Sequence, residues 1–438
     1  MLDWIINVNT ALNNFIWGLP AMICIIGAGL WLTIRTRAIQ VRKFGTAMNN
    51  TLGRVFEKKT AKDGSISPFQ AVCTALAGTV GTGNIAGVAG AVAIGGPGAV
   101  FWMWCSAFLG MCTKFSEVVL AIHFREKNAQ GEYIGGPMYY IKNGLGAKWK
   151  WLASLYALFG VLTVFGTGNA TQVNTIVSSI DTALTSFNLI DADQVSVMKL
   201  MIGIIIALLV SVVLLGGIKR IGQVTEKLVP FMALVYIAGS LIVILCNITR
   251  LPSAVAQIFL GAFNPSAVLG GAAGVTVKEA IRYGVARGLF SNEAGMGSTP
   301  HAHARAVVKN PHCQGLAAMI SVFIDTFIVL NLTVFSILTT NSLSSGKDGI
   351  MLTQYAFSTV FGSFGDIFIA VCLLFFAFST ILGWHFFGSI NVKHLFGKKG
   401  MVPYSVLVAV FIVVGSMLKV DLVWTLADFF NGLMVIPN

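Results

Sequence analysis

The chain has 438 residues, of which 56% are hydrophobic and only 11% are charged, whereas about 25% of the residues in a typical soluble domain are charged. This composition excludes a soluble globular protein and predicts a single all-α membrane domain with many spans. The net charge of +12 does not indicate nucleic-acid binding, because the basic residues gather between apolar segments. We therefore expect the lipid bilayer as a partner and no nucleic acid.

Apolar segments that are candidates to cross a bilayer recur along the whole chain. Alternate connections between them are strongly basic and together carry 21 of the 29 Lys and Arg residues. Because basic loops stay in the cytoplasm, this pattern predicts an N-terminus outside and a C-terminus inside the cell. The basic connections are residues 35–62, 123–150, 219–227, 305–309 and 393–399. The predicted spans are residues 14–34, 68–94, 98–122, 151–178, 198–217, 228–248, 270–305, 312–340, 364–390, 402–418 and 422–438.

The segment 68–94 contains the run Gly81-Thr82-Gly83-Asn84, which interrupts a membrane helix. Unpaired backbone groups are costly in lipid, so irregular backbone persists there only where protein or a polar cavity surrounds it. A half-unwound helix presents carbonyl groups to a cation and amide groups to an anion. This break predicts an ion-coupled transporter of a small zwitterion. Asn84 is a candidate site residue, because an amide in a glycine-rich break has few purely structural uses.

A second glycine-rich stretch, residues 288–298, interrupts the segment 270–305. That segment also carries charged residues, including Lys278 and Glu293, so we expect it in the protein interior. Each break opens a group of five spans, and the two groups have opposite orientation. This predicts an inverted repeat with the substrate site between the broken helices. The expected organisation is an extra helix at 14–34, a first repeat at 68–248 and a second repeat at 270–438.

Further polar residues lie within apolar spans. Gln172 and Asn174 follow a Gly- and Thr-rich run, and Ser379 and Thr380 precede Trp384. Neighbouring hydroxyl groups and freed carbonyls near Gly81 could bind a hard cation, which prefers oxygen ligands. The alternative for the two hydroxyls is a hydrogen bond to their own helix. Trp384 either caps a pocket or packs in the core.

Three carboxylates in apolar helices leave two interpretations open. Glu117 lies three residues from Lys114, so it forms either a local helix pair or a buried counter-charge beneath the broken helix. Asp325 and Asp428 are either proton carriers or hydrogen-bonded structural acids.

Long motifs of this chain resemble the alanine/glycine:cation symporter family, the sodium:alanine symporters. They include residues 68–89, the stretch Gly135-Gly136-Pro137-Met138-Tyr139-Tyr140, and residues 288–298. The resemblance extends over nearly the whole chain and also includes Gln172 with Asn174 and residues 380–384. It implies a LeuT-type fold of five plus five inverted helices, with broken first and sixth core helices and one extra N-terminal helix. It also implies sodium-coupled import of alanine and glycine across the bacterial inner membrane.

Residues 77–84 are further similar to the broken first core helix of the neurotransmitter:sodium symporters. That similarity implies a bound sodium ion and a substrate pocket built from both repeats. The implied sodium ligands are Ala77, Val80, Ser379 and Thr380. The implied substrate-binding residues are Thr82 and Gly83 through backbone amides, Asn84, Gln172, Asn174, Phe290 and Trp384.

Other functions remain as alternatives. A proton-coupled or uncoupled amino-acid permease is compatible with Glu117, Glu293 and Asp325. An enzyme is not expected, because the sequence contains no catalytic constellation, and no obligate protein partner is inferred. Family members usually continue beyond Asn438, so the last predicted helix, about 17 residues long, is expected to be a truncated span.

Overall fold

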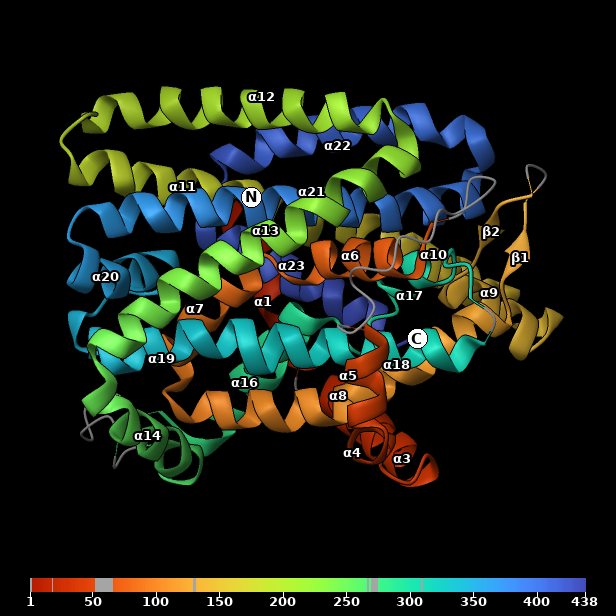
Figure 1. The fold of residues 1–438 in the computed structure, drawn as a ribbon. Coiled ribbons are helices and arrows are strands. Elements are labelled where there is room, and N and C mark those ends of the chain that lie inside the picture. The colour runs from red at the N-terminus through yellow and green to blue at the C-terminus, as the bar shows by residue number, and fades with distance from the viewer. Residues whose placement is uncertain are drawn as a thin grey trace.

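The chain folds almost entirely into helices, and most of the long helices run side by side (Figure 1). The basic residues Arg54, Lys58, Lys59, Lys62 and Lys309 of the predicted cytoplasmic connections lie outside the described residues, as does the start of the second predicted repeat. The computed structural model describes residues 2–17, 19–51, 66–128, 131–265, 268, 275–308 and 310–438.

The helices and strands follow one another along the chain with short connections. The π-helical segments are η1 (Ile23–Gly27), η2 (Gly83–Gly87), η4 (Val164–Ala170) and η7 (Phe323–Leu330). The two strands are β1 (Glu126–Lys127) and β2 (Tyr133–Ile134). The α-helices are α1 (Leu2–Ile16), α2 (Leu19–Met22), α3 (Ala28–Arg35), α4 (Ile39–Arg42), α5 (Phe44–Thr51), α6 (Pro68–Thr79), α7 (Val88–Gly95), α8 (Gly98–His123), α9 (Pro137–Gly144), α10 (Lys150–Thr163), α11 (Thr171–Ser186), α12 (Val195–Leu214), α13 (Gly217–Cys246), α14 (Leu251–Phe263), α16 (Val277–Asn292), α17 (Pro300–His303), α18 (Pro311–Val322), α19 (Asn331–Thr339), α20 (Gly349–Phe361), α21 (Phe364–Phe396), α22 (Met401–Met417) and α23 (Val420–Val435).

Several helical stretches are long and apolar enough to cross a membrane, which confirms the prediction of a multi-span membrane protein. In the described part of the chain they number six, and a bent pair of shorter helices adds a seventh. The last stretch contains two predicted spans, on α21 and α22. The six stretches are Gly98–His123, Ala147–Ser186, Val195–Leu214, Gly217–Cys246, Pro311–Thr339 and Phe364–Met417.

The outer helices are apolar on the faces that they expose. Leu208 on α12 is 62% exposed, and Leu215, directly after this helix, is 88% exposed. Helix α22 lies beside α12 and exposes Val402 and Val406 (Figure 1). A water-soluble protein would bury such side chains, whereas lipid tails solvate them. By contrast, residues 71–89 of the broken helix are all buried, so this segment lies at the centre of the bundle.

Both glycine-rich breaks are present. The halves of the first broken helix, Pro68–Thr79 and Gly83–Gly95, are bent by 46°. In the second, α16 ends where Glu293 adopts a left-handed backbone conformation with φ of 53°. The short helix α17 begins seven residues later, after Gly295 and Gly297 at positive φ. A side chain is strained at such angles, which explains the glycines.

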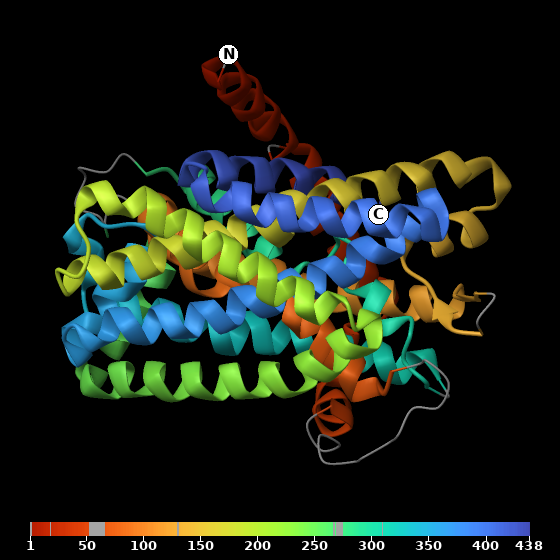
Figure 2. The same cartoon turned by 90° about the horizontal axis from the view of Figure 1, so that it is seen from above.

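Two features were not predicted. Helix α14 packs against α8 where Gly98 and Gly261 meet, so closely that a side chain on Gly98 would overlap the backbone. Strands β1 and β2 form a short antiparallel hairpin in the 123–150 connection of this all-helical membrane domain. The hairpin and α9 lie at one end of the bundle, while α20 and the α11–α12 connection lie at the other (Figure 1). Helix α1 projects from the bundle (Figure 2).

The close packing of the central helices can be tested where α6 and α21 cross. A Cβ atom added to Gly383 on α21 would lie 2.7 Å from the backbone nitrogen of Gly78 on α6. Overpacking of this kind costs about 1–3 kcal/mol. We expect Gly383→Ala to lower the midpoint of thermal unfolding in detergent. The control is Gly90→Ala on α7, because a Cβ at Gly90 would have no heavy atom within 4 Å. Equal midpoints for the two variants would contradict the close crossing.

Candidate functional site

The first break is held open by side chains that take over its amide groups. The backbone nitrogen of Gly81 donates to Oδ1 of Asn84 at 3.0 Å, and that of Thr82 donates to Oε1 of Gln172 at 3.4 Å. In an α-helix these amides would instead bond to the carbonyls of Ala77 and Gly78. The backbone nitrogen of Asn84 donates to the carbonyl of Gly81 at 3.3 Å. In an α-helix it would bond to the carbonyl of Val80, which is therefore also free of this donor. The break therefore frees the carbonyls of Ala77 and Val80 that the sequence resemblance marked as cation ligands.

Asp325 joins the two broken helices. Its Oδ1 accepts a hydrogen bond from Nδ2 of Asn84 at 2.8 Å, and its Oδ2 accepts one from the Ser291 hydroxyl at 2.8 Å. Asn84 belongs to the first break and Ser291 to the last turn of α16, while Asp325 lies in the π-helical segment η7. The Thr326 hydroxyl also donates to Oδ2 at 3.2 Å. All four side chains are fully buried, so this carboxylate is solvated by protein donors alone.

Hydroxyl groups from later helices satisfy the carbonyls of the π-helical segment η2. Thr333 on α19 donates to the Asn84 carbonyl at 2.6 Å, and Thr353 on α20 donates to the Ile85 carbonyl at 2.9 Å. Such bonds replace the regular ladder where a helix widens, and π-helical segments are frequent at functional sites. Neither threonine was predicted as a site residue.

Helix α21 brings Thr380 against the first break. A Cβ atom at Gly81 would lie 2.3 Å from Oγ1 of Thr380, so only glycine fits there. The Thr380 and Ser379 hydroxyls both donate to the carbonyl of Phe376, at 3.0 and 2.8 Å. The predicted alternative of a bond to the helix backbone is thus present. It uses the hydroxyl hydrogens and leaves oxygen lone pairs to bind a cation.

The side chains of Gln172 and Asn174 have different hydrogen-bond partners. Gln172 reaches the first break and also donates from Nε2 to the Thr167 carbonyl at 2.9 Å. Asn174 turns away and donates from Nδ2 to the carbonyls of Gly415 and Leu418, at 3.0 and 2.7 Å. The split follows from their spacing, because residues two apart do not share a face of a helix.

The two predicted aromatic residues are both buried near the breaks. Phe290 lies against Gly83, where a Cβ atom would come within 3.0 Å of its ring, and contacts Trp424 with ring centroids 5.0 Å apart. Trp384 packs over Gly168 and meets the ring of Phe387 at 5.7 Å. Each ring therefore covers a glycine of a neighbouring helix.

A cavity of about 580 Å³ lies between the first break and one end of the bundle. Asn174, Gly87, Trp424, Arg287 and Asp428 are among the side chains and backbone that line it. Asn174 is the one predicted substrate-binding residue that lines this cavity. The other predicted substrate-binding residues all belong to the described part of the chain, and they do not line it. The charge pattern of the connections predicts that this end of the bundle faces outside. The cavity is therefore a candidate entrance, separated from the first break by a barrier.

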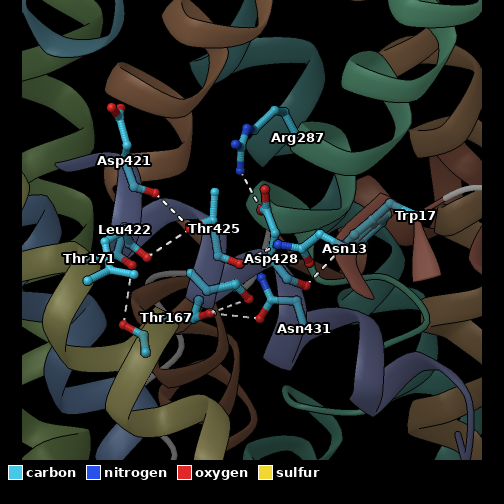
Figure 3. A network of polar contacts seen from close by, with 12 residues as sticks. Asn13, Trp17, Thr167, Thr171, Arg287, Asp421, Leu422, Thr425, Asp428 and Asn431 are labelled. Atoms are coloured by element: carbon cyan, nitrogen blue, oxygen red, sulfur yellow. Dashed lines mark hydrogen bonds and ion pairs between the residues drawn. The ribbon is translucent and has the colours of Figure 1, made fainter. Parts of the chain in front are cut away.

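That barrier is an ion pair over two aromatic rings. Arg287 on α16 contacts Asp428 on α23, with Nη1 and Oδ1 2.5 Å apart. The Arg287 guanidinium lies 4.9 Å from the centre of the Trp424 ring and 5.9 Å from that of Phe290. Trp17, just after α1, donates from its indole to the Asp428 carbonyl at 2.8 Å (Figure 3). Asp428 thus has a structural pairing role, one of the two predicted alternatives.

On the other side of the breaks, Lys114 and Glu117 of α8 both bind the second break. Lys114 Nζ donates to the Glu293 carbonyl at 2.8 Å and to the Thr299 hydroxyl at 2.7 Å. Glu117 Oε1 accepts from the backbone nitrogen of Gly297 at 2.9 Å. Glu117 is therefore a buried counter-charge at a broken helix, as one of the two predicted interpretations has it.

The described residues contain no group of three or more His, Cys, Asp or Glu side chains suited to a metal ion. The oxygens that the structure brings together at the first break are backbone carbonyls and the Thr380 hydroxyl. These are hard neutral oxygen ligands, which suit a weakly held alkali cation better than a transition metal.

Several known proteins are similar to this chain along nearly its whole length. The profile described as the sodium:alanine symporter family matches residues 2–438. A protein of Methanococcus maripaludis named sodium/alanine symporter AgcS is 39% identical over 443 residues, covering 100% of this chain and 94% of its own. An uncharacterized transporter of Haemophilus influenzae is 44% identical, covering 99% of this chain and 92% of its own. A Bacillus subtilis protein named "Probable sodium/glutamine symporter GlnT" is 38% identical, covering 97% and 85%.

The ion pair of the barrier can be tested by a double-mutant cycle. Arg287 and Asp428 are largely buried, with side chains 13% and 17% exposed. We expect Arg287→Gln and Asp428→Asn to be coupled by about 1–3 kcal/mol in the free energy of unfolding in detergent. The control cycle uses Lys142 and Glu126, which pair at 2.9 Å but are 33% and 39% exposed. That cycle should give less than about 1 kcal/mol. Equal coupling in both cycles would show that the barrier pair is not specially stabilised.

Proposed function

Because the chain belongs to the sodium:alanine symporter family, we propose that it imports a small neutral amino acid, alanine or glycine, together with sodium by alternating access. The family consists of multi-pass membrane transporters and not of enzymes. Sodium is then a co-transported substrate rather than a resident cofactor. The single observation that carries the proposal is the buried first break, with freed carbonyls beside the Thr380 hydroxyl.

The proposed architecture is the LeuT-type arrangement of two inverted repeats, with residues 14–34 as the extra helix. Residues 68–248 form the first repeat and 270–438 the second. Two broken helices that meet near the centre of the bundle support it, because such helices build midplane sites in transporters with inverted repeats. The Asn84–Asp325–Ser291 contact gives a physical link between the proposed repeats. In the proposed orientation the barrier over Phe290 faces outside and the hairpin faces the cytoplasm of a bacterial cell.

We propose that sodium binds to the carbonyls of Ala77 and Val80 with the hydroxyl oxygens of Ser379 and Thr380. The hydrogen bonds from the Gly81 and Thr82 backbone amides to the side chains of Asn84 and Gln172 support this site. They pair the amides with side chains, so carbonyls of the first break are left free. Met232 Sδ accepts from the Ser379 hydroxyl at 3.4 Å, so Ser379 has an additional neighbour on α13.

For the substrate we propose the amides of Thr82 and Gly83 as carboxylate ligands, with Asn84 and Gln172 nearby. Phe290 and Trp384 would limit the side chain, since both are buried, Phe290 beside Gly83 at the first break and Trp384 beside Gly168 of η4. Asn174 would contact the amino acid in the outer cavity, because it lines that cavity and its Oδ1 accepts no hydrogen bond within the described structure. A proton-driven permease is the second candidate, favoured by the buried carboxylates of Glu293 and Asp325.

Uptake into proteoliposomes tests the coupling ion. We expect an inward sodium gradient to drive accumulation of radiolabelled alanine and glycine, while a proton gradient alone does not. Removing both hydroxyls, with Ser379→Ala and Thr380→Ala together, should raise the sodium concentration for half-maximal uptake at least about tenfold, the equivalent of about 1.4 kcal/mol. The control is Ser405→Ala on α22, whose hydroxyl lies 3.5 Å from Nε2 of His385 and is not part of the proposed sodium site. Uptake that follows a proton gradient and ignores sodium would refute sodium coupling.

Competition binding tests the pocket wall. Trp384→Phe removes part of a buried aromatic surface, so larger amino acids such as leucine should compete better with alanine, or alanine should bind more weakly. Trp31→Phe is the matched control, because Trp31 on α3 is 61% exposed. If a folded Trp384→Phe protein keeps the original selectivity, Trp384 has no part in the substrate pocket.

A further inference from the structure

Four charged side chains lie together at the second break. Lys114 and Glu117 come from α8, Glu293 from the end of α16, and Asp325 from η7. Lys114 and Asp325 have no exposed surface, and Glu293 and Glu117 are 1% and 5% exposed. Lys114 is within electrostatic range of all three carboxylates. If every group is ionised, the cluster has two more negative than positive charges.

The three carboxylates differ sharply in how the protein solvates them. Asp325 accepts three hydrogen bonds, from Asn84, Ser291 and Thr326. Glu117 accepts two, from the Gly297 amide at 2.9 Å and from Nδ2 of Asn438 at 2.6 Å.

Glu293 is the least solvated of the three. Its Oε2 accepts a hydrogen bond from Ser298, while its Oε1 accepts none within the described structure. The Trp384 indole is a further polar neighbour of this carboxylate. The Lys114 ammonium binds the backbone carbonyl of Glu293 and not its side chain.

These contacts rank the carboxylates by the cost of keeping each one charged. A buried carboxylate without donors is far more costly than one that accepts several hydrogen bonds. Asp325 accepts hydrogen bonds on both oxygens. Glu117 and Glu293 each have one oxygen without a hydrogen bond in the described structure, but Glu117 has two donors on its other oxygen and Glu293 has the Ser298 hydroxyl alone. A proton on Glu293 therefore removes the least compensated charge of the cluster.

We propose that the Glu293 side chain is a proton-binding site and that sodium binding at the first break displaces its proton. Sodium adds one positive charge close to Asn84 and Asp325, and the carboxyl group of Glu293 then releases one proton to water. The total charge of the protein interior stays constant through this exchange. The displacement step rests on the proposed sodium site, whereas the proton on Glu293 does not.

Other titratable groups face the same region and must be separated from Glu293. They are Lys114 and Glu117 on α8, Asp325 on η7, His303 on α17 and Tyr156 on α10. His303 Nδ1 is held by Gln314 at 2.9 Å, and the Tyr156 hydroxyl donates to the Met296 carbonyl at 3.0 Å. Substitution of Glu293 alone distinguishes its proton from theirs.

The first measurement uses the unmodified chain. Purified protein in weakly buffered detergent solution receives sodium chloride or choline chloride, and a pH-indicator dye reports proton release across about pH 5.5 to 8.5. We expect sodium alone to release up to about one proton per protein at some pH in this range. No release at any pH would overturn the proposal, and this result does not depend on the folding of a variant.

The second measurement compares Glu293→Gln with Glu279→Gln, an exposed carboxylate near the start of the same helix. Gln also suits the capping box that Glu279 forms with Thr276, so the control should fold. The readout is the sodium concentration needed for half-maximal thermal stabilisation. It should rise as the pH falls, by up to about tenfold per pH unit, in the wild type and in Glu279→Gln. It should not change with pH in Glu293→Gln.

The outcomes separate this proposal from the proposed function. Stabilisation by sodium with the same pH dependence in all three proteins would overturn the role of Glu293 and leave sodium coupling intact. The absence of any stabilisation by sodium in the wild type would overturn both the proposed sodium site and the displacement step.

Discussion

The hydrogen bond between Asn84 and Asp325 is the contact on which the centre of the molecule depends. The side-chain amide of Asn84 forms two hydrogen bonds: its oxygen accepts from the Gly81 backbone nitrogen, and its nitrogen donates to the Asp325 carboxylate. One end keeps the first helix unwound, and the other ties it to the second broken helix through Ser291. Without this side chain the Gly81 amide would be buried without a partner, at a cost of about 1–3 kcal/mol, and Asp325 would keep only the donors on its Oδ2, Ser291 and Thr326.

The same constraint explains why so many hydroxyl groups surround the breaks. Every backbone group that leaves a helix at this depth must find a partner in the protein. Thr333 and Thr353 supply donors to freed carbonyls, and Gln172 supplies an acceptor to a freed amide. The carbonyls of Ala77 and Val80 receive no such donor from the amides that would normally reach them. The proposed sodium site depends on this selective omission.

Much of this arrangement could be predicted from local sequence. The Gly81–Asn84 and Gly288–Ser298 runs mark both breaks, because glycine and amide residues have few other uses in apolar spans. Sequence could not show that Asp325 joins them, since its contact with Asn84 spans 241 residues and depends on how three helices pack. Asn174 and Gln172 looked equivalent in sequence. Because they are two residues apart, they point to different sides of α11, and only Gln172 contacts the first break. Helix α14 was missed because its 13 residues are too few for a span.

The π-helical geometry of η7 sets the direction in which two distant side chains point. A π-turn contains one residue more than an α-turn, and one residue corresponds to about 100° of rotation around a helix axis. Asp325 lies inside this widened turn and Thr333 beyond it, and both bind Asn84. If Phe323–Leu330 were a regular α-helix of the same length, Thr333 would be rotated by about 100° relative to Asp325 and away from that partner. The angular register between two consecutive helical segments is thus set by one surplus residue, a length requirement that no substitution can replace.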